Sequence, residues 1–400
     1  MKIGFFADQF LPGLDGVVVS MLNLADGLEE LGHEVYFIVP RYPGYAPERH
    51  RVTTIPSLPV PLLGNTRIMA PGYHHKKKIQ ALNLDIVHSH NQLASGRLAV
   101  WAAKKLNVPH VTSIHTIFPE AINYYPKLSR VAKPLIQANM EPLLRSVDLK
   151  AYKPLPTVSG QHSAITDLAW RYIGGFSDLS DTVAVPSDHF GKKLKKLGVK
   201  NPVVTISNSV QLAEFSPKAK AGASRPMQVA AVGRLSPEKR QDVLIEAFAK
   251  LPPDTARLDI IGKGPEESRY KHLASQLAPE ADIRFRGEMP PAKVRSMLAD
   301  ADAAVLASYG FETQGLVLLE YIASGLPVVY CDSNLVEAVG SSAGLLVKPD
   351  SASISGGLER LANNNAHRKK MSKAAIKQSR KFDHIEVAKR MLAVYQRLAR

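Results

Sequence analysis

Short apolar runs alternate with longer amphipathic stretches along most of the chain. KIGFFA at residues 2–7 and LDIVHSH at residues 84–90 are typical of strands buried on both faces, whereas VVVSMLNLADGLEELG at residues 17–32 has helical spacing and ends at Gly32. The alternation predicts an α/β protein with parallel sheets. Residues 41–80 interrupt it, since they are rich in proline, and we expect them to be irregular.

The strand and helix pattern occurs twice. One series runs to the strand VVTISNS at residues 203–209, and the second opens with MQVAAVG at residues 227–233. Between them, residues 211–226 are poor in structure formers and are predicted to be a linker. Because 400 residues with 45% hydrophobic content exceed one ordinary domain, we expect Rossmann-like domains at residues 1–210 and 227–383. Residues 384–400 are predicted to be a helix that could cross back to the first domain.

Residues 308–329, SYGFETQGLVLLEYIASGLPVV, combine a strand-loop-helix-strand unit with two carboxylates. The loop at residues 309–315 leads to a helix start, where free backbone N–H groups and the positive end of the helix dipole favour phosphate. Glu312 lies in the loop and Glu320 in the helix, so acceptors for hydroxyl groups flank this phosphate site. A phosphate-bearing sugar with a ribose attached would use all three features. The alternative is two surface glutamates on an ordinary unit.

Two cations follow the first strand of the second half, in AVGRLSPEKRQDVLIEAF at residues 231–248. Arg234 ends the strand and Lys239 lies where the next helix begins. Beside the helix start near Gly315, they could bind a diphosphate from both sides and stabilise it as a leaving group. This predicts leaving-group activation without a metal, and the alternative is a solvated pair. The D-x-D sequence at residues 300–302 lies between a helix end and a strand, which is the wrong context for a metal site.

Candidate chemistry in the first half is sparser. The loop DQFLPGLDG after the first strand lacks the full dinucleotide fingerprint, so NAD is not expected, but Gly16 could allow close approach of a ligand. His115 follows a strand end, where ligands bind in open α/β sheets; a loop histidine bonded to backbone is the alternative. His88 and His90 form an H-x-H pair, for which no third metal ligand has sensible spacing.

The net charge of +15 and the pI near 9.7 indicate anionic partners. Nucleic acid is not expected, because the basic runs lack interleaved aromatic residues. Residues 121–156 carry Lys127, Arg130 and Lys133 between apolar positions and could lie at a membrane surface or pack on the core. No apolar run approaches the roughly 18 residues of a membrane span, no signal peptide opens the chain, and the one cysteine excludes disulfides. We therefore expect a cytoplasmic protein, peripheral on the inner face of the membrane.

The E-x7-E spacing of Glu312 and Glu320, followed by ASGLPVV, resembles the retaining GT-B glycosyltransferases, the large family of sucrose synthase and the phosphatidylinositol mannosyltransferases. The sequence ETQGLVLLE is most similar to the diacylglycerol glucosyltransferase branch. The resemblance covers nearly all of the chain, because the first glycine loop, the histidine in IHT, G-R-x4-K and E-x7-E occur in the same order as in the family. The resemblance implies two Rossmann-like domains with the active site in the cleft between them. Asn208-Ser209 is a departure, because many relatives have Asn-Gly there.

The resemblance also implies roles for individual residues. Arg234 and Lys239 correspond to ligands of the donor diphosphate, Glu312 to the carboxylate on the sugar hydroxyls, and His115 to the histidine beside the reacting centre. Further donor contacts implied by the family are Gly16, Arg286, Phe311, Thr313, Gly315, Leu316 and Glu320. No carboxylate nucleophile is evident, so same-face attack within an ion pair fits the residues better than a covalent intermediate.

The expected reaction is transfer of a hexose from a nucleotide sugar, UDP-glucose in the first instance, to 1,2-diacylglycerol with retention. The implied partners are the donor, a lipid acceptor and an anionic membrane surface. Two alternatives stay open at this point. One is a GT-B enzyme that uses UDP- or GDP-hexose and a soluble or phosphoinositide acceptor, and the other is a non-catalytic basic binding protein on an inherited fold.

Overall fold

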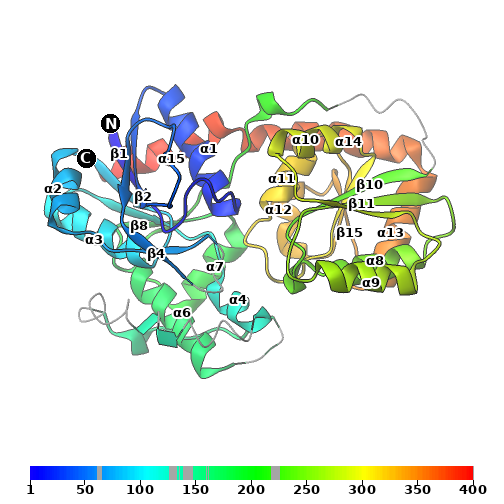
Figure 1. Ribbon diagram of the computed structural model, residues 1–400, viewed down its shortest axis with the longest axis horizontal. Coiled ribbons are helices and arrows are strands. Elements are labelled where there is room, and N and C mark those ends of the chain that lie inside the picture. Colours follow the sequence, from blue (N-terminus) through cyan, green and yellow to red (C-terminus); the bar gives the residue numbers. More distant parts are fainter. Residues whose placement is uncertain are drawn as a thin grey trace. The chain divides into compact units, whose positions relative to one another are not determined.

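The computed structural model describes residues 1–60, 65–125, 133–134, 136–137, 147–158, 160, 162–217 and 226–399. The chain divides into two compact units. The first contains Met1–Asn208 together with His384–Arg400, and the second contains Ser209–Asp383. Each unit is a parallel sheet with helices on both faces (Figure 1).

The first unit is built on a seven-stranded parallel sheet in the order β3-β2-β1-β6-β7-β8-β9. Its strands are β1 (Lys2–Phe6), β2 (Glu34–Pro40), β3 (Val52–Ile55), β6 (Ile86–Ser89), β7 (His110–Ser113), β8 (Thr182–Val185) and β9 (Val203–Thr205), and β4 (Ser57–Pro59) pairs antiparallel with β5 (Arg67–Met69). Its described helices are α1 (Gly16–Glu30), α2 (Tyr73–Ala81), α3 (Ala94–Leu106), α4 (Phe118–Tyr124), α6 (Ala164–Ser177), α7 (Asp188–Leu197) and α15 (His384–Leu398), and the 3₁₀ turn η3 lies at Leu149–Ala151. Apart from Lys2, the residues of the central strands β1, β6 and β7 are buried, as expected for parallel strands covered on both faces.

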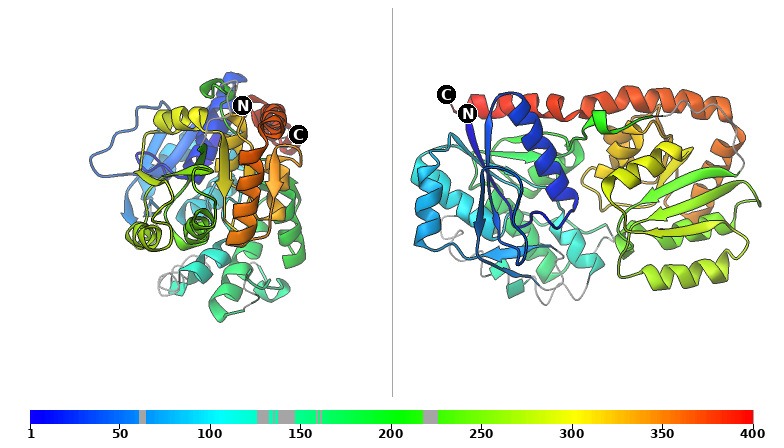
Figure 2. Two further views of the ribbon diagram at one scale, coloured as in Figure 1. Left: turned by 90° about the vertical axis from the view of Figure 1, so that its right-hand side faces the viewer. Right: turned by 45° about the horizontal axis from the view of Figure 1, so that its top comes forward.

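The helix α15 packs against α1 although it follows the whole second unit in sequence, and Figure 2 shows the two helices side by side. Gly27 allows this approach, because a Cβ atom there would lie 2.6 Å from the carbonyl oxygen of His384 and 2.8 Å from the Cβ of Ala388. The imidazole of His384 also bonds the Glu30 carboxylate at 2.9 Å. The two helices cover one face of the first sheet, where Met21, Leu24 and Met391 join its core.

The second unit has a six-stranded parallel sheet in the order β12-β11-β10-β13-β14-β15. Its strands are β10 (Met227–Val232), β11 (Ala256–Ile261), β12 (Ile283–Gly287), β13 (Ala303–Leu306), β14 (Val328–Tyr330) and β15 (Gly344–Leu346). Its α-helices are α8 (Gln241–Ala249), α9 (Glu267–Leu277), α10 (Pro291–Asp300), α11 (Leu316–Ala323), α12 (Val336–Val339), α13 (Ser351–Asn363) and α14 (Asn365–Ser379), and its 3₁₀ turns are η4 (Leu212–Glu214), η5 (Pro237–Lys239), η6 (Ser333–Leu335) and η7 (Arg380–Phe382).

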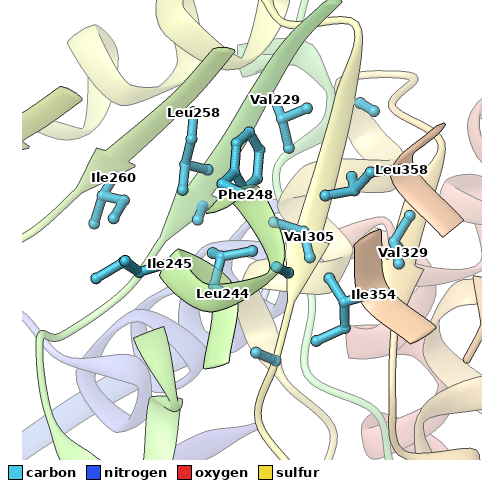
Figure 3. Close-up of a cluster of buried hydrophobic side chains, with 14 of the residues drawn as sticks. Val229, Leu244, Ile245, Phe248, Leu258, Ile260, Val305, Val329, Ile354 and Leu358 are labelled. Carbon is cyan, nitrogen blue, oxygen red and sulfur yellow. The ribbon is translucent and has the colours of Figure 1, made fainter. Parts of the chain in front are cut away.

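The second sheet is covered by a separate apolar cluster on each face. In Figure 3, Leu244, Ile245 and Phe248 of α8 point toward strand residues such as Leu258 and Val305. The opposite cluster contains buried side chains of α11, such as Leu318 and Ile322. This arrangement confirms the predicted pair of Rossmann-like α/β folds with parallel sheets.

The prediction that residues 41–80 are irregular is wrong, because they contain β3, β4, β5 and α2. These strands have only three or four residues each, which is too short for periodicity to show. The helix α2 buries only Ile79 and so lacks an apolar stripe. The short strand β15 was also not anticipated from the sequence.

Two predicted segments lie partly outside the described residues. Within residues 121–156 the structure describes the end of α4, residues 133–134 and 136–137, and a stretch that includes η3; Lys127 and Arg130 lie outside it. Lys133 is described and exposed. Of the predicted linker, residues 211–217 and 226 are described, and they include the 3₁₀ turn η4.

Candidate active site

The loop after β10 holds Arg234 beside a buried carboxylate. Arg234 Nη2 lies 3.2 Å from Glu238 Oε1, and the same oxygen accepts a 2.7 Å hydrogen bond from Ser236 Oγ. Glu238 is 1% exposed, whereas the Arg234 side chain is 55% exposed. A buried acceptor therefore orients the guanidinium and leaves much of it open to an anion. Sequence reasoning missed Glu238, which stands between a proline and two cations and so reads as a surface residue.

Lys239 forms an ion pair with Glu312 across the ends of two different strands. Lys239 Nζ lies 2.6 Å from Glu312 Oε1, and the side chains are 20% and 11% exposed. The ammonium also lies 5.9 Å from the centre of the Phe311 ring. Three residues predicted separately for the donor site are thus brought together by the fold.

Arg240 fixes the loop that carries Lys239. Its backbone is left-handed, with φ of 54°, and it joins η5 to α8. Its guanidinium donates to the carbonyl oxygens of Ala307 at 3.2 Å and Pro349 at 2.7 Å. The first bond ties the β10 loop to the segment after β13, which continues to Glu312, and the second ties it to the segment after β15.

The loop before α11 is held by Asp332, a buried residue just after β14. Asp332 Oδ2 accepts a 2.7 Å hydrogen bond from the backbone N–H of Gly310, which has a φ of 70°. Gly315 has a φ of 75° and is the N-cap residue of α11, where it has no side chain that could cap the helix. Leu316 begins that helix, so its N–H belongs to the first turn. Both glycines stand where a left-handed backbone is required, a conformation that suits glycine best.

Glu320 lies one turn into α11 and is partly buried. Burial raises the pKa of its carboxyl group to about 7; nearby Arg295 opposes the shift and Glu214 adds to it. Arg295 is itself paired with Glu214 at 3.2 Å. Glu320 therefore titrates near neutral pH, unlike an ordinary surface glutamate.

Other predicted residues of the second unit lie in different surroundings. Arg286 lies on the edge strand β12, where its Nε is 2.5 Å from Asp259 Oδ1. Thr313 is partly exposed in the loop before α11. Asp302 of the D-x-D sequence accepts a 2.9 Å bond from the backbone of Gln228, so it fixes the start of β10.

In the first unit, Gly16 is the first residue of α1. Asp15 caps this helix, since its Oδ1 accepts hydrogen bonds from Val17 N at 3.0 Å and Val18 N at 3.1 Å. A Cβ atom on Gly16 would meet nothing within 4 Å. The protein's own packing therefore does not require a glycine there, whereas a ligand close to the backbone would.

His115 follows β7 and belongs to a group of stacked imidazoles. Its Nε2 lies 3.3 Å from His90 Nδ1, and the Asn208 side chain bonds the same ring. Burial lowers the pKa of His115 to about 4 despite the Asn208 bond, so the ring is neutral at pH 7. Sequence reasoning considered His90 only as a metal ligand, and among the described residues no group of three or more metal-binding side chains is suited to hold an ion.

The fold and the charged loops at its strand ends point to a class of enzyme, and comparison with known proteins identifies it. Residues 14–214 match the model of Glycosyltransferase Family 4, and residues 214–378 match that of Glycosyl transferases group 1. The chain therefore belongs to the GT-B glycosyltransferases that these two models describe. This finding confirms the resemblance seen in the sequence.

Similar proteins include two lipid glycosyltransferases. The alpha-monoglucosyldiacylglycerol synthase of Acholeplasma laidlawii is 28% identical over 82% of this chain and 80% of its own. The phosphatidyl-myo-inositol mannosyltransferase of Mycobacterium leprae is 26% identical over 100% of this chain and 97% of its own. Among solved structures, Anabaena Alr3699/HepE in complex with UDP and glucose aligns with a TM-score of 0.72 at 17% identity, over the full length of both chains. This last likeness shows the fold.

Proposed function

We propose that the protein transfers glucose from UDP-glucose to 1,2-diacylglycerol with retention of configuration. The observation that carries this proposal is the pair of fixed cations at the carboxyl edge of the second sheet, Arg234 held by Glu238 and Lys239 held by Glu312. Such a site suits a diphosphate that leaves with negative charge. In this proposal the second unit binds the donor, and the first unit binds the acceptor.

The donor is proposed to bind along the strand ends of the second unit. Arg234 and Lys239 contact the diphosphate together with the N–H groups of Gly315 and Leu316. Glu312 accepts hydrogen bonds from the sugar hydroxyls and Glu320 from the ribose. The remaining donor contacts are proposed to be Phe311 and Thr313 in the same loop, Arg286 near the base, and Gly16 of the first unit.

The Lys239 and Glu312 pair can remain intact while the donor binds. An ammonium group has three donors, so Lys239 can bond Glu312 and a phosphate oxygen at once. The cation then links the carboxylate on the sugar to the leaving group. A lysine held in this way needs little reorganisation when charge develops on the diphosphate.

Retention is proposed to follow from same-face attack. Glu312 is already paired with a cation and is assigned to the sugar hydroxyls, so it is not free to act as a nucleophile at the anomeric carbon. In the proposed step the leaving phosphate oxygen accepts the proton of the acceptor hydroxyl, while the two cations stabilise the diphosphate.

A phosphoinositide acceptor is the second candidate. It is favoured by the Mycobacterium leprae phosphatidyl-myo-inositol mannosyltransferase, which matches this chain over its full length. The diacylglycerol proposal is supported by the Acholeplasma laidlawii synthase, which is slightly more similar over a shorter part of the chain.

An anionic membrane surface is proposed to contact α2. This helix carries lysines at residues 76–78, and its Tyr73 is 74% exposed, with Lys77 Nζ 4.9 Å from the ring centre. Exposed lysines beside an exposed aromatic ring suit a phospholipid interface, and the net charge of +15 acts in the same direction. In the described part of the chain, no helix is both long and apolar enough to cross a membrane. We propose a peripheral location on the cytoplasmic face of the cell membrane.

Product analysis tests the reaction. The protein is incubated with UDP-glucose, UDP-galactose or GDP-mannose and anionic vesicles that contain diacylglycerol, phosphatidylinositol or neither lipid, with Lys239→Ala as the control. We expect a hexosyl-diacylglycerol from UDP-glucose, identified by mass spectrometry. A mannosyl-phosphatidylinositol would instead establish the second candidate. Hydrolysis of the donor without any lipid product would contradict both lipid acceptors.

Vesicle flotation tests the membrane surface. Lys77→Ala/Lys78→Ala should weaken binding to anionic vesicles at low salt, where charges are least screened. Lys195→Ala/Lys196→Ala on α7 removes the same charge from exposed positions and should bind like the parent protein. A third variant that replaces Lys127, Arg130 and Lys133 tests the other basic segment. Equal binding of the α2 variant and the parent would exclude α2 as the membrane contact.

A further inference from the structure

A cluster of buried aromatic rings lies behind His115 in the first unit. The His90 ring is 1% exposed and lies 4.2 Å from the His88 ring, 4.6 Å from the Phe5 ring and 5.6 Å from the His115 ring, measured between ring centres. The rings of His90 and His115 are nearly parallel, at an interplanar angle of 11°. His90 is therefore held on several sides and has little freedom to turn.

His88 is anchored at both of its nitrogens. Its Nδ1 lies 2.6 Å from the hydroxyl oxygen of Tyr395 on α15, and its Nε2 lies 2.8 Å from Ser113 Oγ. Burial lowers the pKa of His88 and His90 well below the ordinary value, so both rings are neutral. A neutral imidazole carries one proton, and the position of that proton decides which nitrogen donates.

The hydrogen bonds of His90 determine which of its two ring nitrogens carries the proton. Within the described residues its Nε2 is buried and has no hydrogen-bond partner, whereas its Nδ1 faces His115 Nε2 at 3.3 Å. A buried N–H without a partner is more costly than an unfilled acceptor. The favourable arrangement places the proton of His90 on Nδ1, from which it is donated to His115. His115 Nε2 must then be an acceptor, and the proton of His115 lies on Nδ1.

The second hydrogen bond of His115 is the one that a ligand can replace. His90 is buried, whereas Asn208 is partly exposed, as is His115 itself. The Asn208 side chain is shared with α1, because its Oδ1 accepts a 2.7 Å bond from Ser20 Oγ. A ligand oxygen could thus take the place of Asn208 while His90 keeps the ring in position.

We propose that His90 is a positioning residue that keeps His115 neutral and protonated at Nδ1, so that His115 offers an N–H donor to an oxygen of the transferred sugar. The His88 ring stabilises the position of the His90 ring, and Tyr395 of α15 in turn holds His88. The sugar as ligand rests on the proposed function. The position of the proton on His115 is a property of the protein alone. His90 contacts no substrate, and its effect passes through His115.

The test measures the proton position and the activity separately. In protein labelled with ¹⁵N-histidine, long-range ¹H–¹⁵N spectra distinguish a protonated from an unprotonated ring nitrogen, and His115→Asn assigns the signals. We expect His115 to be protonated at Nδ1 in the parent protein between pH 6 and pH 8. His90→Leu should give a mixture of tautomers and lower kcat by at least ~10-fold, with little change in KM for the donor.

Two variants separate positioning from packing. His90→Asn can place an amide N–H near the site of Nδ1, so it should retain the Nδ1 tautomer of His115 and most of the activity. His110→Asn alters another buried histidine of the sheet, which bonds Ser89 Oγ at 3.0 Å, and should change neither readout. Protonation of His115 at Nε2 in the parent, or an unchanged tautomer in His90→Leu, would overturn the inference. Absence of glycosyl transfer by the parent would instead contradict the proposed function and leave the spectroscopic result standing.

Discussion

Glu320→Gln should stabilise the unliganded protein at alkaline pH and not at acidic pH. The carboxyl group is partly buried in α11, and this burial raises its pKa to about 7 from an ordinary value of 4.5. Arg295 does not neutralise it fully, because its guanidinium is paired with Glu214. Above neutral pH the folded protein therefore carries a charge at Glu320 that the surroundings disfavour. Glutamine has nearly the same shape and never carries this charge.

The magnitude follows from the pKa shift. A rise from 4.5 to about 7 corresponds to at most roughly 3 kcal/mol, and screening by water at a partly exposed group reduces this to about 1–2 kcal/mol. Because the folded state has the higher pKa, it binds more protons than the unfolded state between these two values. The free energy of unfolding of the parent therefore falls as pH rises through this window and levels off above it. The advantage of Glu320→Gln should grow over the same interval.

Thermal unfolding measured at half-unit steps from pH 4.5 to pH 8.5 provides the assay. At 2–4 °C per kcal/mol, the variant should gain roughly 2–8 °C over the parent at pH 8, relative to any difference at pH 4.5. Glu312→Gln is the matched control, since it removes the carboxylate that pairs with Lys239 and should lower the unfolding temperature at pH 8. A Glu320→Gln advantage that is the same at every pH would refute the reasoning.

The raised pKa of Glu320 also predicts that binding of UDP releases a proton. Ribose hydroxyls that donate to Glu320 favour its ionised form, so UDP should bind more weakly as pH falls below 7 and should release close to one proton at pH 6. Calorimetry in two buffers with different ionisation enthalpies measures this release. Glu320→Gln should release fewer protons than the parent, by close to one, because the remaining release comes from the terminal phosphate of UDP, whose second pKa is near 6. Binding of UDP to the parent without proton release would contradict the proposed ribose contact.

The remaining predictions concern the ion pair, the packing of α15 and metal dependence. Glu312→Ala should abolish transfer and leave the Kd for UDP nearly unchanged, whereas Lys239→Ala should weaken both transfer and UDP binding, because of these two residues only Lys239 is proposed to contact the diphosphate. Transfer assays and calorimetry measure the two effects, and equal effects of the two variants would contradict these roles. Gly27→Ala should destabilise the first unit by about 1–2 kcal/mol through overlap with α15, whereas Gly356→Ala, in α13 with nothing within 4 Å of its added Cβ, should be neutral or stabilising. Transfer should persist in excess EDTA, since two cations provide the charge for the leaving group, and strict dependence on a divalent ion would contradict this account.

Long buried strands and amphipathic helices were predictable from the sequence, whereas short edge elements were not. Strands such as β1 and β10 are apolar apart from Lys2 and Gln228, so the order of such runs predicted both parallel sheets. The strands β3 and β15 lie at sheet edges and have four and three residues, too few for a pattern. The helix α2 is polar on most of its surface, so its lysines read as a solvated run.

The residue types of the candidate site were predictable, but their mutual contacts were not. Lys239 and Glu312 belong to two recognisable motifs, yet the 2.6 Å contact between them depends on the fold that brings two strand ends together. Glu238 was missed because its neighbours in sequence indicate an exposed turn. In the structure the turn η5, which ends at the left-handed Arg240, buries the side chain of Glu238. His90 was considered for a metal because sequence alone does not show that its ring stacks on His115.

The packing of α15 on α1 has a consequence for the order of folding during synthesis. The second unit is inserted into the first, so the ribosome completes all of Ser209–Asp383 before it makes the helix that covers α1. Until then the apolar residues of α1 that join the core with Met391 and Tyr395 lack that cover. The second unit is contiguous and can fold first, whereas the first is completed only after translation of its last helix. In this chain the N-terminal half therefore cannot be completed before α15 has been synthesised.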